Sequence, residues 1–137
     1  MLISAESVNT LAGRIGSSSE IFCSGLFLSA RWFVVSQLDH DGIQMIVLPD
    51  KDSAEYCAAD LYNLIEGDRI FFLPDSGKTL ERSNYKSTLG VQRTSSIGKI
   101  VGYDGGQLII VTYPAALEEG IPDTKKIKES VFNLTVG

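Results

Sequence analysis

Apolar positions along the chain form two kinds of pattern, a helical period and short continuous runs. The helical period of three to four residues is found in residues 8–15, 54–65 and 84–100. Short apolar runs without that period predict strands: EIFCS at 20–24, GIQMIVLPD at 42–50, RIFFL at 69–73 and QLIIVTY at 107–113. Between the first two strands, LFLSARWFVVSQL at 26–38 is about as long as a crossover helix. Predicted strands and helices therefore alternate along the chain.

This alternation predicts an α/β fold. Short apolar strands joined through helices are typical of right-handed βαβ units, which place the strands parallel and the helices on both faces of the sheet. We therefore predict a three-layer architecture with an open, mainly parallel sheet. The chain is predicted to form a single domain, residues 1–137, in which residues 123–137 are a boundary segment. The end of that segment, VFNLTVG at 131–137, alternates like a strand at the edge of a sheet.

Composition and charge narrow the range of functions. The net charge of −5 offers no general electrostatic attraction to a phosphate backbone, so direct binding of nucleic acid is not expected. Cys23 and Cys57 lie in apolar stretches without C-x-x-C spacing, a pattern typical of buried, reduced thiols in a cytoplasmic protein. The longest apolar stretch, residues 21–35, contains Arg31 and falls short of the ~20 apolar residues of a membrane span. We expect a cytoplasmic protein with no membrane partner.

The segment PDSGKTLE at 74–81 contains the tail of a phosphate-binding loop, G-x-x-x-x-G-K-[ST]. Residues 77–79, Gly-Lys-Thr, match the last three positions of this motif. Phe72 stands where the motif needs its first glycine, and Pro74 lacks a backbone N–H that could face a phosphate. We therefore predict a polar connecting loop at this place.

Other ionisable side chains allow two interpretations. Asp50 and Asp75 follow predicted strands, and with Lys78 they would form a small magnesium- or nucleotide-binding site at the carboxyl ends of those strands. Each aspartate is also followed by a helix or a turn, so capping accounts for it without chemistry, and we favour capping. His40, the single histidine, lies in a turn, and the sequence has neither a G-x-S-x-G elbow nor a reactive-cysteine context. No catalytic residue, metal ligand or cofactor is predicted.

In phosphate-loop folds the loop follows the first strand, and GLFLSARW at 25–32 occupies that place. Gly25 matches the first glycine of the motif, but Ala30 replaces the second glycine, Arg31 the lysine and Trp32 the hydroxyl residue. Ala30 adds a Cβ where the backbone must approach phosphate, Arg31 is not the compact charge of lysine, and Trp32 has no oxygen for Mg²⁺. The segment is therefore either a decayed phosphate-binding loop or simply a strand, a glycine and a buried helix.

The order of these segments resembles the N-terminal domain of the bacterial transcription-repair coupling factor (Mfd) family. That domain is itself similar to the first motor subdomain, domain 1A, of the excision-repair helicase UvrB, with its phosphate-binding loop decayed. The resemblance covers nearly the whole chain and is most specific at LPDKDSAEY (48–56), FFLPDSGKT (71–79) and IVTYPAAL (110–117).

The resemblance implies that the chain is an N-terminal fragment of a much longer protein. The complete protein of the family is an ATP-driven DNA translocase that displaces stalled RNA polymerase and recruits UvrA to the lesion. It implies that this lobe is not an enzyme and binds no nucleotide at Gly25, Ala30, Arg31 and Trp32. Its partners would be the other lobes of the same protein, with UvrA and RNA polymerase engaged through the full-length protein.

Two alternatives stay open beside the resemblance. One is a small nucleotide- or magnesium-binding α/β switch or enzyme domain that uses Asp50, Asp75 and Lys78. The other is a stand-alone protein-interaction domain.

Overall fold

A computed structural model describes residues 5–15, 17, 20–38, 41–66, 68–77 and 84–121 of the chain. These residues form five helices and three strands. In chain order they are α1 (Ala5–Ile15), α2 (Ala30–Ser36), β1 (Gly42–Val47), α3 (Lys51–Leu64), β2 (Ile70–Phe72), α4 (Asn84–Val101), β3 (Gln107–Thr112) and α5 (Pro114–Glu118). His40, Lys78 and the predicted boundary segment at 123–137 lie outside the described residues.

The three strands form one parallel sheet in the order β1-β3-β2. Strand β3 pairs with β1 over its whole length, from Gln107 opposite Gly42 to Thr112 opposite Val47. On its other side β3 pairs in parallel with the shorter β2. The predicted α/β class with a parallel sheet is therefore confirmed for the described residues, with three strands in place of the four expected before residue 114.

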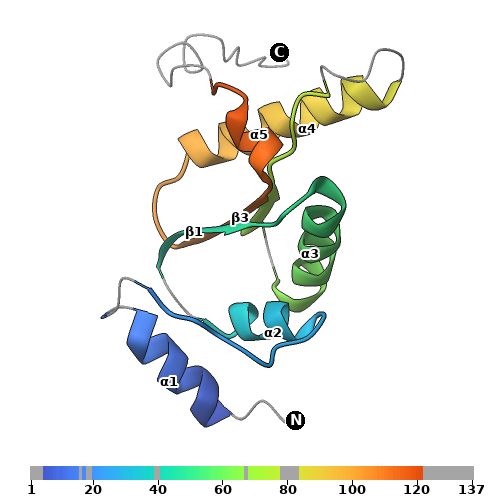
Figure 1. Cartoon of the computed structure of the whole chain (residues 1–137). Coiled ribbons are helices and arrows are strands. Elements are labelled where there is room, and N and C mark those ends of the chain that lie inside the picture. The colour runs from blue at the N-terminus through green and yellow to red at the C-terminus, as the bar shows by residue number, and fades with distance from the viewer. Residues whose placement is uncertain are drawn as a thin grey trace.

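Helices cover both faces of this sheet (Figure 1). One core lies between the sheet, α2 and α3, and it takes Ile109 and Val111 from the middle strand. The other core lies on the opposite face, under α4, and it takes Leu108 and Ile110. Because neighbouring residues of a strand point to opposite faces, β3 needs apolar side chains at all four of these positions.

Local sequence sets the position of α3. Asp50 stands before the helix in extended conformation, and its carboxylate accepts a hydrogen bond from the Ser53 N–H at 2.8 Å. This cap fixes where the helix begins, directly after β1. The buried residues of α3 follow the helical period: Ala54, Cys57, Ala58 and Leu61. That face packs on the sheet and on α2.

The predicted helix at 84–100 is confirmed as α4, although Gly90 and Gly98 lie inside it. Neither glycine has an atom near the place where a Cβ would stand, so close packing does not require glycine there. Among the described residues, α4 is the longest helix, and no helix is both long and apolar enough to span a membrane.

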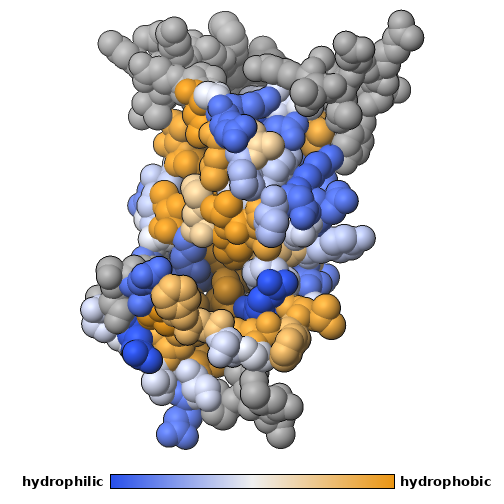
Figure 2. Space-filling view, viewed as in Figure 1, coloured by the Kyte–Doolittle hydropathy of each residue, from blue (hydrophilic) through white to orange (hydrophobic). Residues whose placement is uncertain are grey.

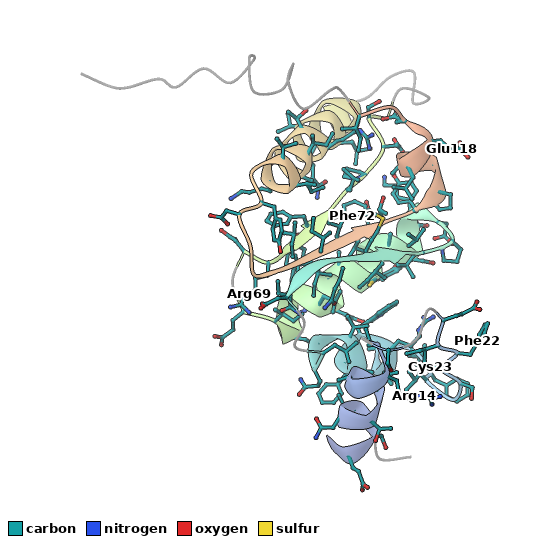
Figure 3. All side chains as sticks on the ribbon, turned by 90° about the vertical axis from the view of Figure 1, so that its left-hand side faces the viewer. Arg14, Phe22, Cys23, Arg69, Phe72 and Glu118 are labelled. Atoms are coloured by element: carbon teal, nitrogen blue, oxygen red, sulfur yellow. The ribbon has the colours of Figure 1, made fainter. Side chains whose placement is uncertain are left out.

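The predicted strand at 20–24 is wrong. These residues have no regular secondary structure, Phe22 is 88% exposed, and Cys23 is exposed rather than buried. Figure 3 shows Phe22 and Cys23 close to Arg14 of α1, at the opposite end of the molecule from Glu118. An apolar run becomes a strand only where a neighbour takes its backbone hydrogen bonds, and the described sheet ends at β1 without this segment.

The predicted helix at 26–38 is shorter in the structure, where α2 covers Ala30–Ser36. Leu28 has a positive φ of 49°, and Gly25 has one of 79°. A residue in the left-handed region cannot continue a right-handed helix, so α2 begins only after Ser29.

The burial of side chains in α3 predicts which substitutions lower the free energy of unfolding most. Leu61 is fully buried, whereas Leu64, one turn further along the helix, is 41% exposed. Leu61→Ala leaves a cavity in the core and is expected to lower the free energy of unfolding by about 3 kcal/mol. Leu64→Ala is expected to lower it by about 1 kcal/mol or less. Urea denaturation of both variants measures the difference, and equal losses would place Leu61 outside the core.

Candidate functional site

The segment aligned with a phosphate-binding loop forms a loop and then a helix. The chain turns through residues 25–28, and the Ala30 N–H donates to the Phe27 carbonyl at 3.1 Å. The Ser29 hydroxyl, just before α2, does not cap this helix and instead donates to the Asp60 carboxylate of α3 at 2.6 Å. The expected order of loop and helix is present, whereas the strand that should precede the loop is not.

Arg31 and Trp32, which stand at the lysine and hydroxyl positions of the motif, are used in packing. Trp32 is 8% exposed and belongs to the core shared by α2, α3 and the sheet. The Arg31 guanidinium carbon lies 4.8 Å from the centroid of the Trp32 ring, a cation–π contact. The Arg31 Nε also donates to the Leu28 carbonyl at 3.4 Å. Both side chains are therefore engaged locally.

The two aspartates considered as a metal pair have different roles. Asp50 caps α3, as favoured from the sequence, and the hydrogen bond from the Ser53 N–H lowers the pKa of Asp50 below its usual value. Asp75 accepts the Gly77 N–H on Oδ1 at 2.6 Å and the Tyr113 hydroxyl on Oδ2 at 2.7 Å. Strand β3 lies between the strands that precede them, so two spacings of about 4.8 Å separate the strand ends. Among the described residues, no three His, Cys, Asp or Glu side chains are grouped to hold a metal ion.

Tyr113 lies at the carboxyl end of the middle strand. Its hydroxyl accepts a hydrogen bond from the Asp75 N–H at 3.0 Å while it donates to the Asp75 carboxylate. Burial raises the pKa of Tyr113 well above its usual value; the hydrogen bond from the Asp75 N–H opposes this rise, and the Asp75 carboxylate adds to it. The phenol is therefore protonated at neutral pH and acts as a hydrogen-bond donor. The Tyr113 ring is stacked on the Phe72 ring, with 6.2 Å between the two ring centroids.

The residue that the sequence analysis missed is Arg93 of α4, which is 6% exposed. Its Nη1 donates to the carbonyl oxygens of Pro74 at 2.7 Å and Ala116 at 3.1 Å. Its Nη2 donates to the Glu119 carbonyl at 3.0 Å, and its Nε lies 3.3 Å from the Glu119 carboxylate. One side chain thus joins α4 to the loop after β2 and to the segment that contains α5.

A signal for Arg93 was present in the sequence. It lies four residues from Leu89 and four from Ile97, which are both buried, so the helical period places it on the buried face of α4. An arginine on such a face needs hydrogen-bond acceptors. Those acceptors are mainly carbonyl oxygens of segments distant in the sequence, and no pattern in the sequence predicts them.

We call Asp75, Ser76, Arg93, Tyr113 and Glu119 the carboxyl-edge cluster. Within it, Ser76 donates through its N–H and its hydroxyl to the Glu119 carboxylate, at 2.9 and 2.6 Å. Among the described residues, no buried side-chain nitrogen or oxygen lacks a hydrogen-bond partner. The cluster therefore works as a clamp that holds the end of β2, α4 and α5 together, and both oxygens of Asp75 already accept hydrogen bonds.

No model of a known protein family matches the chain, and no curated protein or solved structure matches it either. The described residues form an α/β unit with a three-stranded parallel sheet.

The clamp predicts a large effect of substitutions at Arg93. Arg93→Met removes the donor of three carbonyl groups and the ion-pair partner of the Glu119 carboxylate, which keeps its hydrogen bonds from Ser76, so we expect the free energy of unfolding to fall by about 3 kcal/mol. Lys51→Met is the control, because Lys51 forms a more exposed ion pair with Glu55 within α3 and its loss is expected to cost about 0.5 kcal/mol or less. Chemical denaturation measures both, and similar costs would mean that Arg93 holds nothing together.

The two cysteines are expected to differ in reactivity. Burial raises the pKa of the Cys57 thiol from 9.0 to about 12; the Asp60 carboxylate adds to this rise, and Arg31 opposes it. At about pH 8 we therefore expect Ellman's reagent to modify the exposed Cys23 in the native protein, and Cys57 only after unfolding. Because the pKa is raised in the folded state, the resulting stabilisation is complete below pH 9.0 and is lost as the pH rises toward about 12. Equal rates for both native thiols would contradict the burial of Cys57.

Proposed function

We propose that the chain is a non-catalytic N-terminal module of a transcription-repair coupling factor. In this proposal it is the UvrB-like first lobe, a degenerate phosphate-loop domain that contributes structure and contact surface. The family's ATP-driven displacement of RNA polymerase and its recruitment of UvrA would belong to the full-length protein. The resemblance of the segments at 48–56, 71–79 and 110–117 supports this assignment.

The observation that carries the proposal is the packing of Arg31 and Trp32. A working phosphate-binding loop needs a lysine ammonium on the phosphates and a hydroxyl on Mg²⁺. Trp32 is instead buried against α3, and Arg31 lies on the Trp32 ring. Ala30, at the second glycine position, is already the first residue of α2. A nucleotide at this loop would therefore meet neither the lysine nor the hydroxyl residue of the motif.

The alternative of a magnesium or nucleotide switch has less support. It needs Asp50 and Asp75 as free ligands, but Asp50 caps a helix and Asp75 is hydrogen-bonded on both oxygens. An interaction role has more support. Three large apolar side chains close together in the sequence are nearly fully exposed, namely Phe22 at 88%, Phe27 at 79% and Leu28 at 84%. Such side chains are typical of a surface that another protein or lobe covers.

Calorimetric titration with Mg·ATP tests the non-catalytic assignment. We expect no binding heat at a nucleotide concentration of about 1 mM, where even weak specific sites fill. The double variant Ala30→Gly, Arg31→Lys is expected to bind no better, because Trp32 still lacks the hydroxyl that Mg²⁺ needs. Micromolar binding that Lys78→Ala abolishes would support the switch, and micromolar binding that Arg31→Ala abolishes would show that the loop still functions.

The coupling-factor assignment is tested on the source gene. We expect the reading frame to continue past the codon for Gly137 into a second α/β lobe. Further on it should encode an intact G-x-x-x-x-G-K-[ST] with helicase motifs. A stop codon directly after Gly137 would contradict this assignment and favour a stand-alone interaction domain.

A further inference from the structure

The two outer strands of the sheet differ in how their free edges are covered. At the outer edge of β2, the Phe72 carbonyl accepts a hydrogen bond from the Ser96 hydroxyl of α4 at 2.6 Å. Folded proteins often cover an edge strand in this way, because unpaired backbone groups attract further strands.

The outer edge of β1 has a different character. The N–H of Gly42 donates to the Gly106 carbonyl at 2.8 Å, and the N–H of Leu48 donates to the Thr112 carbonyl at 2.9 Å. Residues 42, 44, 46 and 48 therefore turn their backbone groups toward β3. By the two-residue alternation of a parallel strand, Ile43, Met45 and Val47 turn theirs outward, away from the sheet.

The side chains of the same three residues form a half-exposed apolar row. Ile43, Met45 and Val47 are 48%, 52% and 50% exposed. In the pairing register they stand opposite the buried residues Leu108, Ile110 and Thr112 of β3, on the face that α4 covers. The row thus continues the core of that face beyond α4. Figure 2 shows apolar side chains at the surface in the middle of the view, where β1 and β3 run in Figure 1.

We propose that the outer edge of β1 binds an extended polypeptide strand from outside these 137 residues. The strand would pair with the outward backbone groups of Ile43, Met45 and Val47, and its alternate apolar side chains would cover their half-exposed row. Addition of a strand to a sheet edge combines main-chain hydrogen bonds with side-chain contacts at every second residue. Such a surface goes beyond the proposed function, because it specifies where a partner binds and what the chemistry of that partner is.

The charges at the two ends of β1 indicate what kind of strand would bind there. Asp41 precedes β1, and Asp50, with an exposed carboxylate, follows it, while Lys51 is paired with Glu55. The chain as a whole carries a net charge of −5. A strand with an apolar centre and basic residues at both ends complements this edge.

A second copy of the chain complements it poorly. Two-fold antiparallel pairing of β1 with itself, centred on Met45, brings Asp41 of each copy to the end of β1 where Asp50 of the other copy lies. Like charges across such a pair are destabilising.

Residue-resolved amide hydrogen exchange of the isotopically labelled chain tests the proposal. The probe is the synthetic peptide Lys-Val-Thr-Val-Thr-Val-Lys. At saturation we expect exchange of the Ile43, Met45 and Val47 amides to slow by about tenfold or more, while Gln44 and Ile46, which already pair with β3, change little. The matched peptide Glu-Val-Thr-Val-Thr-Val-Glu is expected to give much weaker protection.

Two variants at one position separate backbone pairing from side-chain contact. Met45→Pro removes an outward N–H that β3 does not use, so we expect the fold to survive and peptide protection at Ile43 and Val47 to be lost. Met45→Ala keeps that N–H and is expected to retain most of the protection. Circular dichroism of both variants verifies the fold.

Several outcomes would overturn the proposal. One is an absence of protection with the basic peptide. Another is equal protection by the acidic peptide, which would remove the charge argument. Slow exchange of the Ile43, Met45 and Val47 amides in the free chain would show that the edge is already covered, by a second copy if the effect depends on protein concentration and by this chain itself if it does not.

Discussion

The structure depends on the burial of one strand on both faces. Strand β3 has a neighbour on each side and a core above and below it, so its residues from Leu108 to Val111 are all apolar and all buried. A strand in that position requires a helical layer on each face. Strand connectivity then decides which helix takes which face. The connection from β1 to β2, which contains α3, crosses over β3 in one direction, and the connection from β2 to β3, which contains α4, runs in the opposite direction. Because such crossovers are right-handed, the two helices lie on opposite faces of the sheet.

Parallel pairing also brings the carboxyl ends of the strands to one edge, where open α/β sheets generally bind ligands. In this chain the edge is occupied by the carboxyl-edge cluster. Arg93 reaches across it from α4 to the carbonyl groups of Pro74 and Ala116, and Glu119 joins Arg93 to Ser76. Buried charges need partners of this kind, because an unpaired guanidinium away from water is costly. Groups that in other α/β proteins face a ligand are here engaged in holding β2, α4 and α5 together.

Side chains at the loop before α2 are likewise used for packing within the protein. Trp32 fills the core against α3, and Arg31 lies on its ring. The same position cannot hold both a large buried side chain and the hydroxyl residue that a phosphate-binding loop needs for Mg²⁺. Among the described residues, two surfaces stand out: the exposed apolar side chains at 22–28 and the outer edge of β1, which pairs with no other described strand. Both fit the proposed role of a lobe that acts through contacts with other polypeptide segments.

The sequence by itself determined the α/β class, α1, α3, α4, the three observed strands and the cap at Asp50. These features follow from the period of apolar residues and from capping chemistry within a few residues, which are local. Only the tertiary structure decided that residues 20–24 stay outside the sheet, that Cys23 is exposed, and that Arg93 and Glu119 close the carboxyl edge. The physical reason is the same in each case. The partners of these groups are backbone atoms of distant segments, and a one-dimensional pattern carries no information about which segments the fold brings together.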